Sequence, residues 1–327
     1  DHRRQRQMCI RDSPGVALIE APSEREEASA IAFIMREALE TPGQTAALVS
    51  TDQKLARRVA TALSRWGIDV DNSAGTPLIR TTAGRFLRLV ADAVAQNLAP
   101  AALLALLKHP YTACGMDKMS FHTQVRRLER HILRGVRPSP GLEGLSDALQ
   151  GLDEDDELHD LFARLQLCVG EFETSLQQKD TPLQDLVQTH VRCAEALCKD
   201  AEKAGDHKLW ANPDGDTAAQ FMAQLMDAAP GLDLINGDAY SALFTSLLDG
   251  EVVRTSYGSH PRLSIWGTIE ARLQAADIMI LGGLNEGSWP SPPSPDPWMS
   301  EPMRVEFGLP SAERRIGLAA HDFVQSM

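Results

Sequence analysis

The chain has 327 residues, of which 43% are hydrophobic and 24% charged, and its formal net charge is −13. This composition is typical of a globular protein with a substantial core and excludes a wholly disordered chain. No uninterrupted apolar run approaches the roughly 18 residues that a membrane span needs, so we expect no membrane partner. The acidic balance argues against a surface that binds nucleic acid everywhere, but it leaves room for a local basic groove.

The two ends of the sequence are unusual. Residues 1–13, DHRRQRQMCIRDS, lack apolar periodicity and have no signal-peptide core, and the string MCIRDS resembles a translated sequencing-adaptor remnant. We therefore treat this tail as a possible artefact and leave it out of the fold prediction. At the other end Met327 stops inside an amphipathic helical pattern. We expect the chain to be an internal piece of a longer protein.

Cysteine usage favours a reducing, cytoplasmic compartment. The five cysteines are odd in number and widely scattered, in a chain long enough not to need disulfides; they are Cys9, Cys114, Cys168, Cys193 and Cys198. His190 lies close in sequence to Cys193 and Cys198, but a fourth ligand at a recognisable spacing is missing. We favour ordinary buried thiols over a metal site and expect no cofactor in this segment.

The first 70 residues alternate between strand and helix patterns. Strand-like runs at 16–20, 45–50 and 68–70 are separated by helical patterns at 23–40 and 52–66. Ser23 and Glu26 form a capping box at the first helix, and Gly67 closes the second. The β-α-β-α-β order predicts a parallel sheet in an α/β fold.

After this alternation the sequence shows only helical patterns until strand signals return near the end. The predicted helices are 85–97, 101–108, 120–133, 157–177, 183–203, 217–228 and 239–248. Strands are then predicted at 263–266 and 277–282, followed by a proline-rich loop and a helix from Ser311. We therefore expect a sheet domain formed by residues 14–99 and 256–327, interrupted by an all-helical insertion at 100–255.

Charge is segregated inside the predicted insertion. Five arginines occur within twelve residues: Arg126, Arg127, Arg130, Arg134 and Arg137. Their spacings of three and four place most of them along one helix flank, which is suited to following phosphates. Residues 143–160 carry eight acidic residues and no Lys or Arg. A solvated arginine face paired with this acidic run is an equally good interpretation.

The common catalytic motifs are absent. No lysine follows a glycine, which excludes a P-loop, and the sequence has no G-x-S-x-G, H-E-x-x-H or G-x-G-x-x-G motif. Residues 213–216, PDGD, begin like a metal-nuclease motif, but no E-x-K follows. We interpret them as a turn and helix N-cap. No residue of this segment is predicted to be catalytic.

The last third of the sequence carries the most specific motifs. Residues 277–290, DIMILGGLNEGSWP, follow the strand-like 263–266 and the segment 268–273, and ERRIGLAAHDF lies at 313–323. These motifs resemble the second RecA-like domain of UvrD-type helicases. The block as a whole resembles AddB-type subunits of AddAB helicase–nucleases, most closely their alphaproteobacterial form. Residues 16–72 resemble the entry to the same domain.

The resemblance implies a degenerate RecA-like fold and a role in processing double-strand DNA breaks. It implies an AddA-like helicase–nuclease subunit as partner, with ATP and magnesium in that motor. It also implies an iron–sulfur cluster in a nuclease domain beyond this segment, so the cysteines present here are not assigned to that cluster. The DNA partners would be a single strand and a duplex end.

The motifs depart from those of working motors. Active relatives read approximately Thr-x-His-x-x-Lys-Gly-Leu-Glu where this chain has Thr268 and Glu270 but no Lys-Gly pair. The last motif keeps Glu313, Arg314 and Arg315, but His321, Asp322 and Phe323 stand where a Thr-Arg pair is expected. A phenylalanine offers no charge to a γ-phosphate, so the arginine-finger role is lost. The resemblance therefore implies a helicase-like body without its motor.

Further DNA-binding candidates lie where the last predicted strand ends, the edge at which open α/β sheets bind ligands. They are Gly283, Asn285 and Trp289. The glycine either allows close approach of a DNA strand or meets the needs of a tight turn with positive φ. Trp289 and Trp298 either stack bases or pack the proline-rich loop onto the sheet. Trp66 and Trp266 are expected in the core.

These observations predict a non-motor, helicase-like segment that contacts and scans single-stranded DNA beside a partner motor subunit. One alternative is the C-terminal half of an active superfamily-one ATP-dependent helicase, with Arg314 or Arg315 replacing the lost finger. A second alternative is a purely structural docking module without DNA contact.

Overall fold

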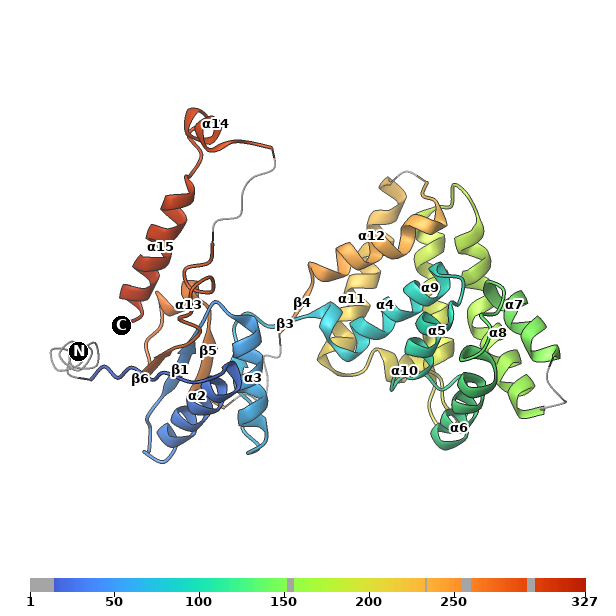
Figure 1. Ribbon diagram of the computed structural model, residues 1–327, viewed down its shortest axis with the longest axis horizontal. Helices are drawn as coiled ribbons and strands as arrows, with labels where there is room; N and C mark the ends of the chain where they lie inside the picture. Colours follow the sequence, from blue (N-terminus) through green and yellow to red (C-terminus); the bar gives the residue numbers. More distant parts are fainter. Residues whose placement is uncertain (1–14, 152–155, 233, 255–259, 293–297) are drawn as a thin grey trace. The chain divides into compact units, whose positions relative to one another are not determined.

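The computed structural model describes residues 15–151, 156–232, 234–254, 260–292 and 298–327. By its internal contacts the chain divides into two compact units (Figure 1). The sheet unit combines both ends of the sequence, Asp1–Gly75 and Arg254–Met327, and the helical unit is the continuous middle, Thr76–Val253.

The sheet unit is built on four parallel strands. These are β1 (Ala46–Val49), β2 (Asp71–Asn72), β5 (Leu263–Trp266) and β6 (Ile278–Leu281), in the order β2-β5-β1-β6. Ala46 is in register with Leu263 on one side and with Ile278 on the other. The α/β class is therefore confirmed, and so is the expectation that strands from both ends of the sequence share one parallel sheet.

Helices cover both faces of this sheet (Figure 1). Along the central strand β1 the side chains alternate in direction: Leu48 packs with α2 (Glu24–Ala38) and α3 (Gln53–Ser64), whereas Val49 packs on the opposite side with Trp266 and Ala271. That opposite face also receives α13 (Thr268–Ala271) and α15 (Ala312–Gln325). All four residues of β1 are buried, as expected for a strand covered on both faces.

Local signals account for the helix starts in this unit. The side chains of Ser23, Asp52 and Ser311 each accept a backbone N–H in the first turn of α2, α3 and α15. Gly67, with φ +69°, follows α3 in the left-handed conformation that ends a helix. A six-residue helix, α14 (Glu301–Glu306), lies between β6 and α15 in the chain.

Two strand predictions in this region need correction. Residues 16–20 form no strand, and the side chains of Leu18 and Ile19 are 61% and 58% exposed. An apolar run without a paired strand edge has no backbone hydrogen bonds to hold it extended in a sheet. The run 68–70 precedes its strand: β2 comprises Asp71 and Asn72, while Ile68 and Val70 pack against the α2–α3 side of the core.

The helical unit consists of helices joined by short turns, with one small β pair. Its elements are β3 (Thr76–Pro77), η1 (Leu78–Arg80), α4 (Thr82–Ala95), α5 (Pro100–Leu107), α6 (Lys118–Leu128), η2 (Glu129–Leu133), α7 (Gly141–Gln150), α8 (Asp156–Gln177), α9 (Leu183–Cys198), α10 (Gly205–Leu209), α11 (Asn212–Ala228), η3 (Ala229–Gly231), α12 (Gly237–Asp249) and β4 (Val252–Val253). The strands β3 and β4 pair antiparallel where the unit begins and ends.

One continuous apolar core holds the helical unit together. Its largest fully buried side chains include Phe86 of α4, Phe121 of α6, Phe172 of α8, and Tyr240 and Phe244 of α12. Because α4 contributes its apolar face to this core, the unit begins at Thr76 rather than at residue 100. The contact boundary thus lies one helix earlier than the sequence analysis placed it.

Several helix boundaries differ from the predictions for identifiable reasons. The α-helix predicted at 120–133 ends at Leu128 and continues as a π-helical turn. The helix predicted to reach residue 203 ends at Cys198, because the Asp200 side chain accepts the backbone N–H groups of Glu202 and Lys203 in a tight turn. Residues 213–216 lie inside the first turn of α11 and not before it. The helices α7 and α10 were missed.

Candidate nucleic-acid interface

The arginine-rich segment lies on α6, on the π-helical turn after it and on the following loop. Arg127 Nη1 forms an ion pair of 2.5 Å with Glu157 Oε2 of α8, and Gln124 donates to the same carboxylate oxygen. Arg127 is therefore paired with the acidic run, as the alternative interpretation expects. A phosphate would have to compete with Glu157 for this guanidinium.

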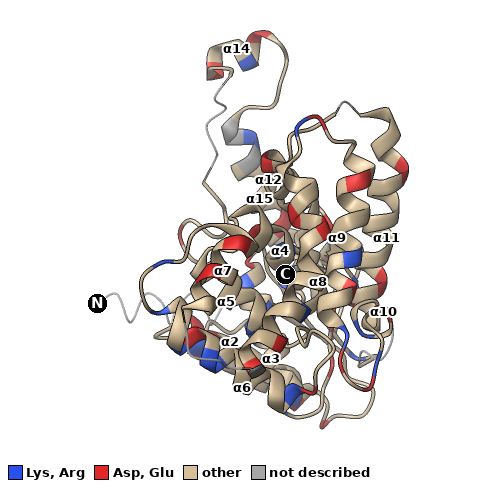
Figure 2. Cartoon of the chain, turned by 90° about the vertical axis from the view of Figure 1, so that its right-hand side faces the viewer, with Lys and Arg blue, Asp and Glu red and all other residues tan. Residues whose placement is uncertain are grey.

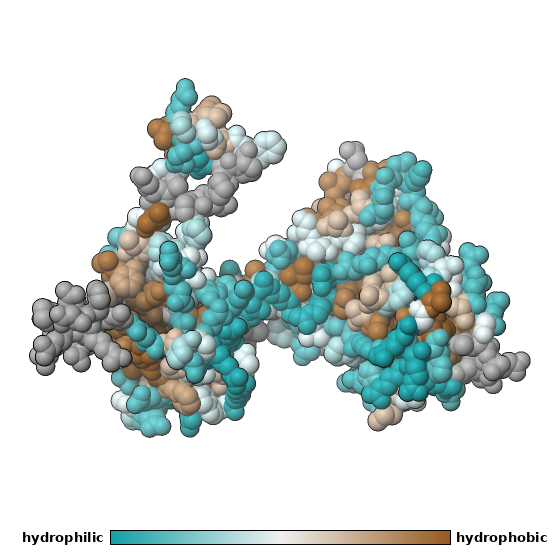
Figure 3. Space-filling view, in the orientation of Figure 1, coloured by the Kyte–Doolittle hydropathy of each residue, from teal (hydrophilic) through white to brown (hydrophobic). Residues whose placement is uncertain are grey.

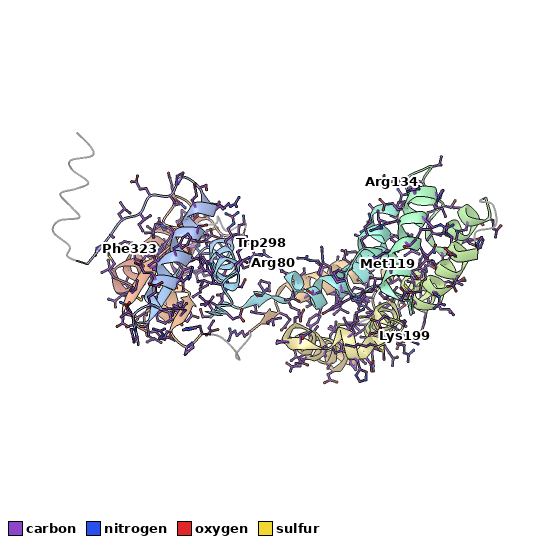
Figure 4. The ribbon with its side chains drawn as sticks, turned by 90° about the horizontal axis from the view of Figure 1, so that it is seen from below. Arg80, Met119, Arg134, Lys199, Trp298 and Phe323 are labelled. Atoms are coloured by element: carbon purple, nitrogen blue, oxygen red, sulfur yellow. The ribbon has the colours of Figure 1, made fainter. Side chains whose placement is uncertain are left out.

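A second arginine of the segment is held by Glu129. The Arg134 side chain donates to Glu129 Oε1 from Nη2 at 2.7 Å and from Nε at 3.1 Å, and Lys108 Nζ lies 2.7 Å from Oε2. Hydrogen bonds from Lys108 and Arg134 lower the pKa of the Glu129 carboxyl group. Figure 4 shows Arg134 at one end of the helical unit. The pairing ties the π-helical turn to α5.

The other three arginines have side chains directed to solvent. Arg126, Arg130 and Arg137 are exposed, and no ion pair of theirs is found among the residues that the structure describes. The five predicted phosphate contacts therefore separate into two paired guanidinium groups and three available ones. Arg126, Arg130 and Arg137 are thus the remaining candidates for phosphate contacts.

The glycine-rich turn after β6 is held by contacts within the sheet unit. Gly283, with φ +76°, donates its N–H to Glu27 Oε1 of α2 at 2.8 Å. A Cβ at this position would lie 3.2 Å from Ser50 Oγ. Both the tight turn and the close approach at Gly283 are thus explained by packing on α2 and on Ser50, which follows β1. The exposed Asn285 accepts the N–H groups of Ser288 and Trp289 through its carbonyl.

Trp289 does not offer a surface for stacking a base. It is buried, its Nε1 donates to the carbonyl of Ala319 at 3.1 Å, and its ring meets Phe323 edge to face at 6.2 Å. Of the two interpretations of Trp289, the base-stacking one therefore needs correction: the indole packs the loop onto α15. Trp266 is buried as expected, whereas Trp66 is 37% exposed and does not belong to the core. Trp298 is 88% exposed.

Two of the positions that the sequence analysis compares with the last helicase motif are used for internal contacts. The carboxylate of Asp322, 9% exposed, pairs with Arg272 Nη2 at 2.6 Å and so joins α15 to the residue that follows α13. Phe323 packs on Trp289. Asp322 and Phe323 are two of the three residues at the place where the resemblance expects Thr-Arg, and both contact the sheet unit's own residues. The third, His321, is exposed.

The other residues of these motifs make contacts with residues close to them in sequence. Thr268 begins α13, and the Glu270 carboxylate folds back over Gly267, where a Cβ would lie 2.8 Å from Oε2. Arg314 is exposed, and its backbone N–H binds the N-cap Ser311. The side chains of Glu313 and Arg315 lie outside the described residues, as does the tail at 1–13.

The histidine and cysteines considered as a metal site are buried in the helical unit. Both ring nitrogens of His190 are engaged: Nδ1 lies 2.9 Å from the Tyr240 hydroxyl and Nε2 lies 3.0 Å from the Leu87 carbonyl. Burial raises the pKa of the Cys193 thiol, and it raises that of Cys198 to about 11. In the described part of the chain no three potential ligands cluster. His190 is a hydrogen-bonded core residue.

The sequence analysis missed a group of cations on the sheet unit. A groove of about 620 Å³ lies between α2 and α3, and we call it the α2–α3 groove; its lining is Arg25, Ala28, Ser29, Lys54, Arg57, Arg58, Thr61, Ala62 and Arg65. The signal was the helical spacing of cations at 54, 57, 58 and 65, which recurs on one flank of a helix. The same segment also carries capping and strand patterns, and these indicate only the fold.

Comparisons with known proteins do not assign this chain to a family. Neither protein-family models nor curated protein sequences gave a match to this chain. Among the described residues, no helix combines the length and the apolar character required to cross a membrane.

Proposed function

We propose that this chain is a non-motor, helicase-like segment of a double-strand-break repair helicase–nuclease subunit of the AddB type. It contacts single-stranded DNA beside an AddA-like motor subunit, in the cytoplasm, and ATP turnover belongs to that partner. The proposal includes a degenerate RecA-like fold, with the helical unit as an insertion in the sheet domain. It assigns no catalytic residue and no cofactor to this segment.

The observation that carries the proposal is the use made of Asp322 and Phe323. Three residues, His321, Asp322 and Phe323, stand where the resemblance expects a nucleotide-contacting Thr-Arg pair; Asp322 is paired with Arg272 and Phe323 packs on Trp289. Neither is free to reach a phosphate. The parallel sheet assembled from both ends of the chain is compatible with a RecA-like domain, and the exposed Arg126, Arg130 and Arg137 supply cations for DNA.

The first test is ATP hydrolysis by the purified chain with and without single-stranded DNA. We expect DNA to leave hydrolysis at background, because Asp322 and Phe323 make contacts within the sheet unit and a phenylalanine offers no charge to a γ-phosphate. Robust DNA-stimulated turnover that is abolished by Arg314→Ala would contradict the proposal. That result would favour the active superfamily-one helicase instead.

The second test addresses the DNA contact of the helical unit. Replacing Arg126, Arg130 and Arg137 with glutamine is expected to weaken binding of labelled oligothymidylate and to make its salt dependence shallower. Each lost phosphate contact reduces the log–log salt slope by about 0.7 for single strands. The matched control removes three exposed cations elsewhere in the unit, Lys179, Arg192 and Lys203. Fluorescence anisotropy at several salt concentrations measures both.

A structural docking role is the second candidate, and one observation favours it. Apolar side chains are exposed on α15 and around α14: Ile316 is 43% exposed, Leu318 48%, Val324 65% and Phe307 70%. Figure 3 shows hydrophobic residues at the surface over these two helices. Exposed apolar surface commonly marks a protein interface. DNA affinity that is insensitive to salt and unchanged in the triple arginine variant would favour docking alone.

A further inference from the structure

The α2–α3 groove concentrates positive charge on an acidic protein. Five of its nine lining residues are cations: Arg25 of α2 and Lys54, Arg57, Arg58 and Arg65 of α3 or its C-cap. Over the chain as a whole, acidic and basic residues are interspersed (Figure 2). From Lys54 to Arg65 the cations extend over about 16 Å of helix. An elongated basic groove of this kind suits a chain of negative charges better than a single small anion.

Little of this charge is neutralised by the protein. No acidic residue lines the groove. The nearby Glu24 pairs with Arg58, at 2.6 Å between Oε2 and Nη1, and both side chains are about half exposed, which leaves this pair open to exchange with another anion. For Lys54, Arg57 and Arg65, no ion pair is found in the described parts of the chain. Their positive charge is therefore available to a ligand.

An aromatic pair extends the groove at one end. Phe33 lies one helical turn beyond the lining residue Ser29 on α2. Trp66 lies in the turn after α3, directly after the lining residue Arg65. Their ring centroids are 5.3 Å apart, and the Arg36 guanidinium lies 4.9 Å from the Trp66 ring centroid. Phe33 is 58% exposed and Trp66 is 37% exposed.

The basic groove and the aromatic platform formed by Phe33 and Trp66 together indicate one class of ligand. Proteins that bind single-stranded nucleic acid combine a positively charged groove for the backbone with aromatic side chains on which unpaired bases stack. In a duplex the base faces are already stacked and cannot reach such a platform. An acidic peptide would use the cations but has no planar group for the exposed rings.

We propose that the α2–α3 groove binds single-stranded polynucleotide. The phosphodiester backbone lies along Lys54, Arg57 and Arg65, and a base at one end stacks on Trp66 and Phe33. This site lies on the sheet unit and is separate from the arginines of the helical unit on which the proposed function draws. Its ligand chemistry is shared by DNA and RNA, and the test includes both.

The charge of the groove is tested with the full chain and fluorescein-labelled oligothymidylate of about 16 nucleotides, the upper range of single-strand site sizes. Lys54→Gln combined with Arg57→Gln and Arg65→Gln is expected to weaken binding at least tenfold. The log–log salt slope should become shallower by about 2, from three lost phosphate contacts. The Lys179, Arg192 and Lys203 glutamine variant removes equal charge and should bind like the wild type.

The aromatic platform is tested separately. Trp66→Ala is expected to weaken oligothymidylate binding about tenfold, because a stacked base is lost, while Trp66→Phe retains most of the affinity. An abasic oligonucleotide of the same length should bind equally to all three proteins. Thermal unfolding of each variant checks that the exposed positions leave the fold intact.

Competition separates the possible ligands. Oligothymidylate and oligouridylate should both displace the labelled strand. Stronger displacement by oligothymidylate indicates DNA as the natural ligand, and stronger displacement by oligouridylate indicates RNA. A duplex of equal length should displace the strand less effectively. Displacement by polyglutamate as potent as that by oligothymidylate would overturn the proposal in favour of an acidic protein ligand. Unchanged binding in the groove variant, with loss in the Arg126, Arg130 and Arg137 variant, would overturn it while leaving the proposed function standing.

Discussion

Replacing Gly237 with alanine is expected to destabilise the helical unit by about 3 kcal/mol or more, because the added methyl group has no room. Gly237 begins α12, and a Cβ there would lie 2.0 Å from the carbonyl oxygen of Leu176 and 2.5 Å from its Cα, in the last turn of α8. Backbone atoms cannot rotate away as a flexible side chain can. Urea denaturation followed by circular dichroism measures the loss.

The same helix pair supplies the control. Gly170 lies in the middle of α8, and a Cβ there would meet only Leu142 Cδ1, at an ordinary contact distance of 3.8 Å. Gly170→Ala should therefore stabilise the protein by about 0.5–1 kcal/mol, through helix propensity. If Gly237→Ala were as stable as the wild type, the close approach of α12 to the backbone of Leu176 would be contradicted.

Acidification is expected to destabilise the helical unit through His190. The ring is fully buried between Phe172, stacked at 5.0 Å, and Phe244, edge-on at 4.7 Å. Burial lowers the pKa of His190 from 6.5 to about 4, with partial compensation by the hydrogen bond to Leu87. Below pH 6.5 the unfolded chain therefore binds a proton that the folded protein does not, and stability falls as the pH drops towards 4.

The expected contribution of His190 at pH 4.5 is a loss of about 2–3 kcal/mol relative to pH 7. Carboxyl groups titrate in the same range, so the measurement compares variants. The difference in unfolding free energy between pH 7 and pH 4.5 should be smaller in His190→Gln than in the wild type by this amount. His122→Gln, at an exposed position of α6, is the matched control substitution. An identical pH dependence in His190→Gln would contradict the burial argument.

The helices with strong periodicity or clear caps could be predicted from sequence alone. Ser23, Asp52 and Ser311 were each identified as helix starts, because an N-cap acts within one turn of its own residue. The helix α7 was missed because its glycine-rich start and acidic surroundings obscured the spacing of Leu142, Leu145 and Leu149, which are all buried. The five residues of α10 are too few to show a period.

The candidate site was less predictable, because a residue's availability depends on partners remote in sequence. Helical spacing identified the arginines, but only the folded chain shows that Glu157 and Glu129 hold two of them. Trp289 has the residue type and loop position of a base-stacking residue, and it is instead buried against Ala319 and Phe323. Pairing and burial of this kind leave no local trace in composition or periodicity.

What the sequence by itself determined was the class of fold and the caps of its helices, because propensity, periodicity and capping act over a few residues. Tertiary structure alone decided that β1 lies between two strands from beyond the helical unit, and that α4 belongs to that unit. It also aligned cations and aromatic rings of α2 and α3 into one basic groove. A chain of net charge −13 thus carries a local positive surface, because packing brings together charges from two helices while their average over the sequence is unchanged.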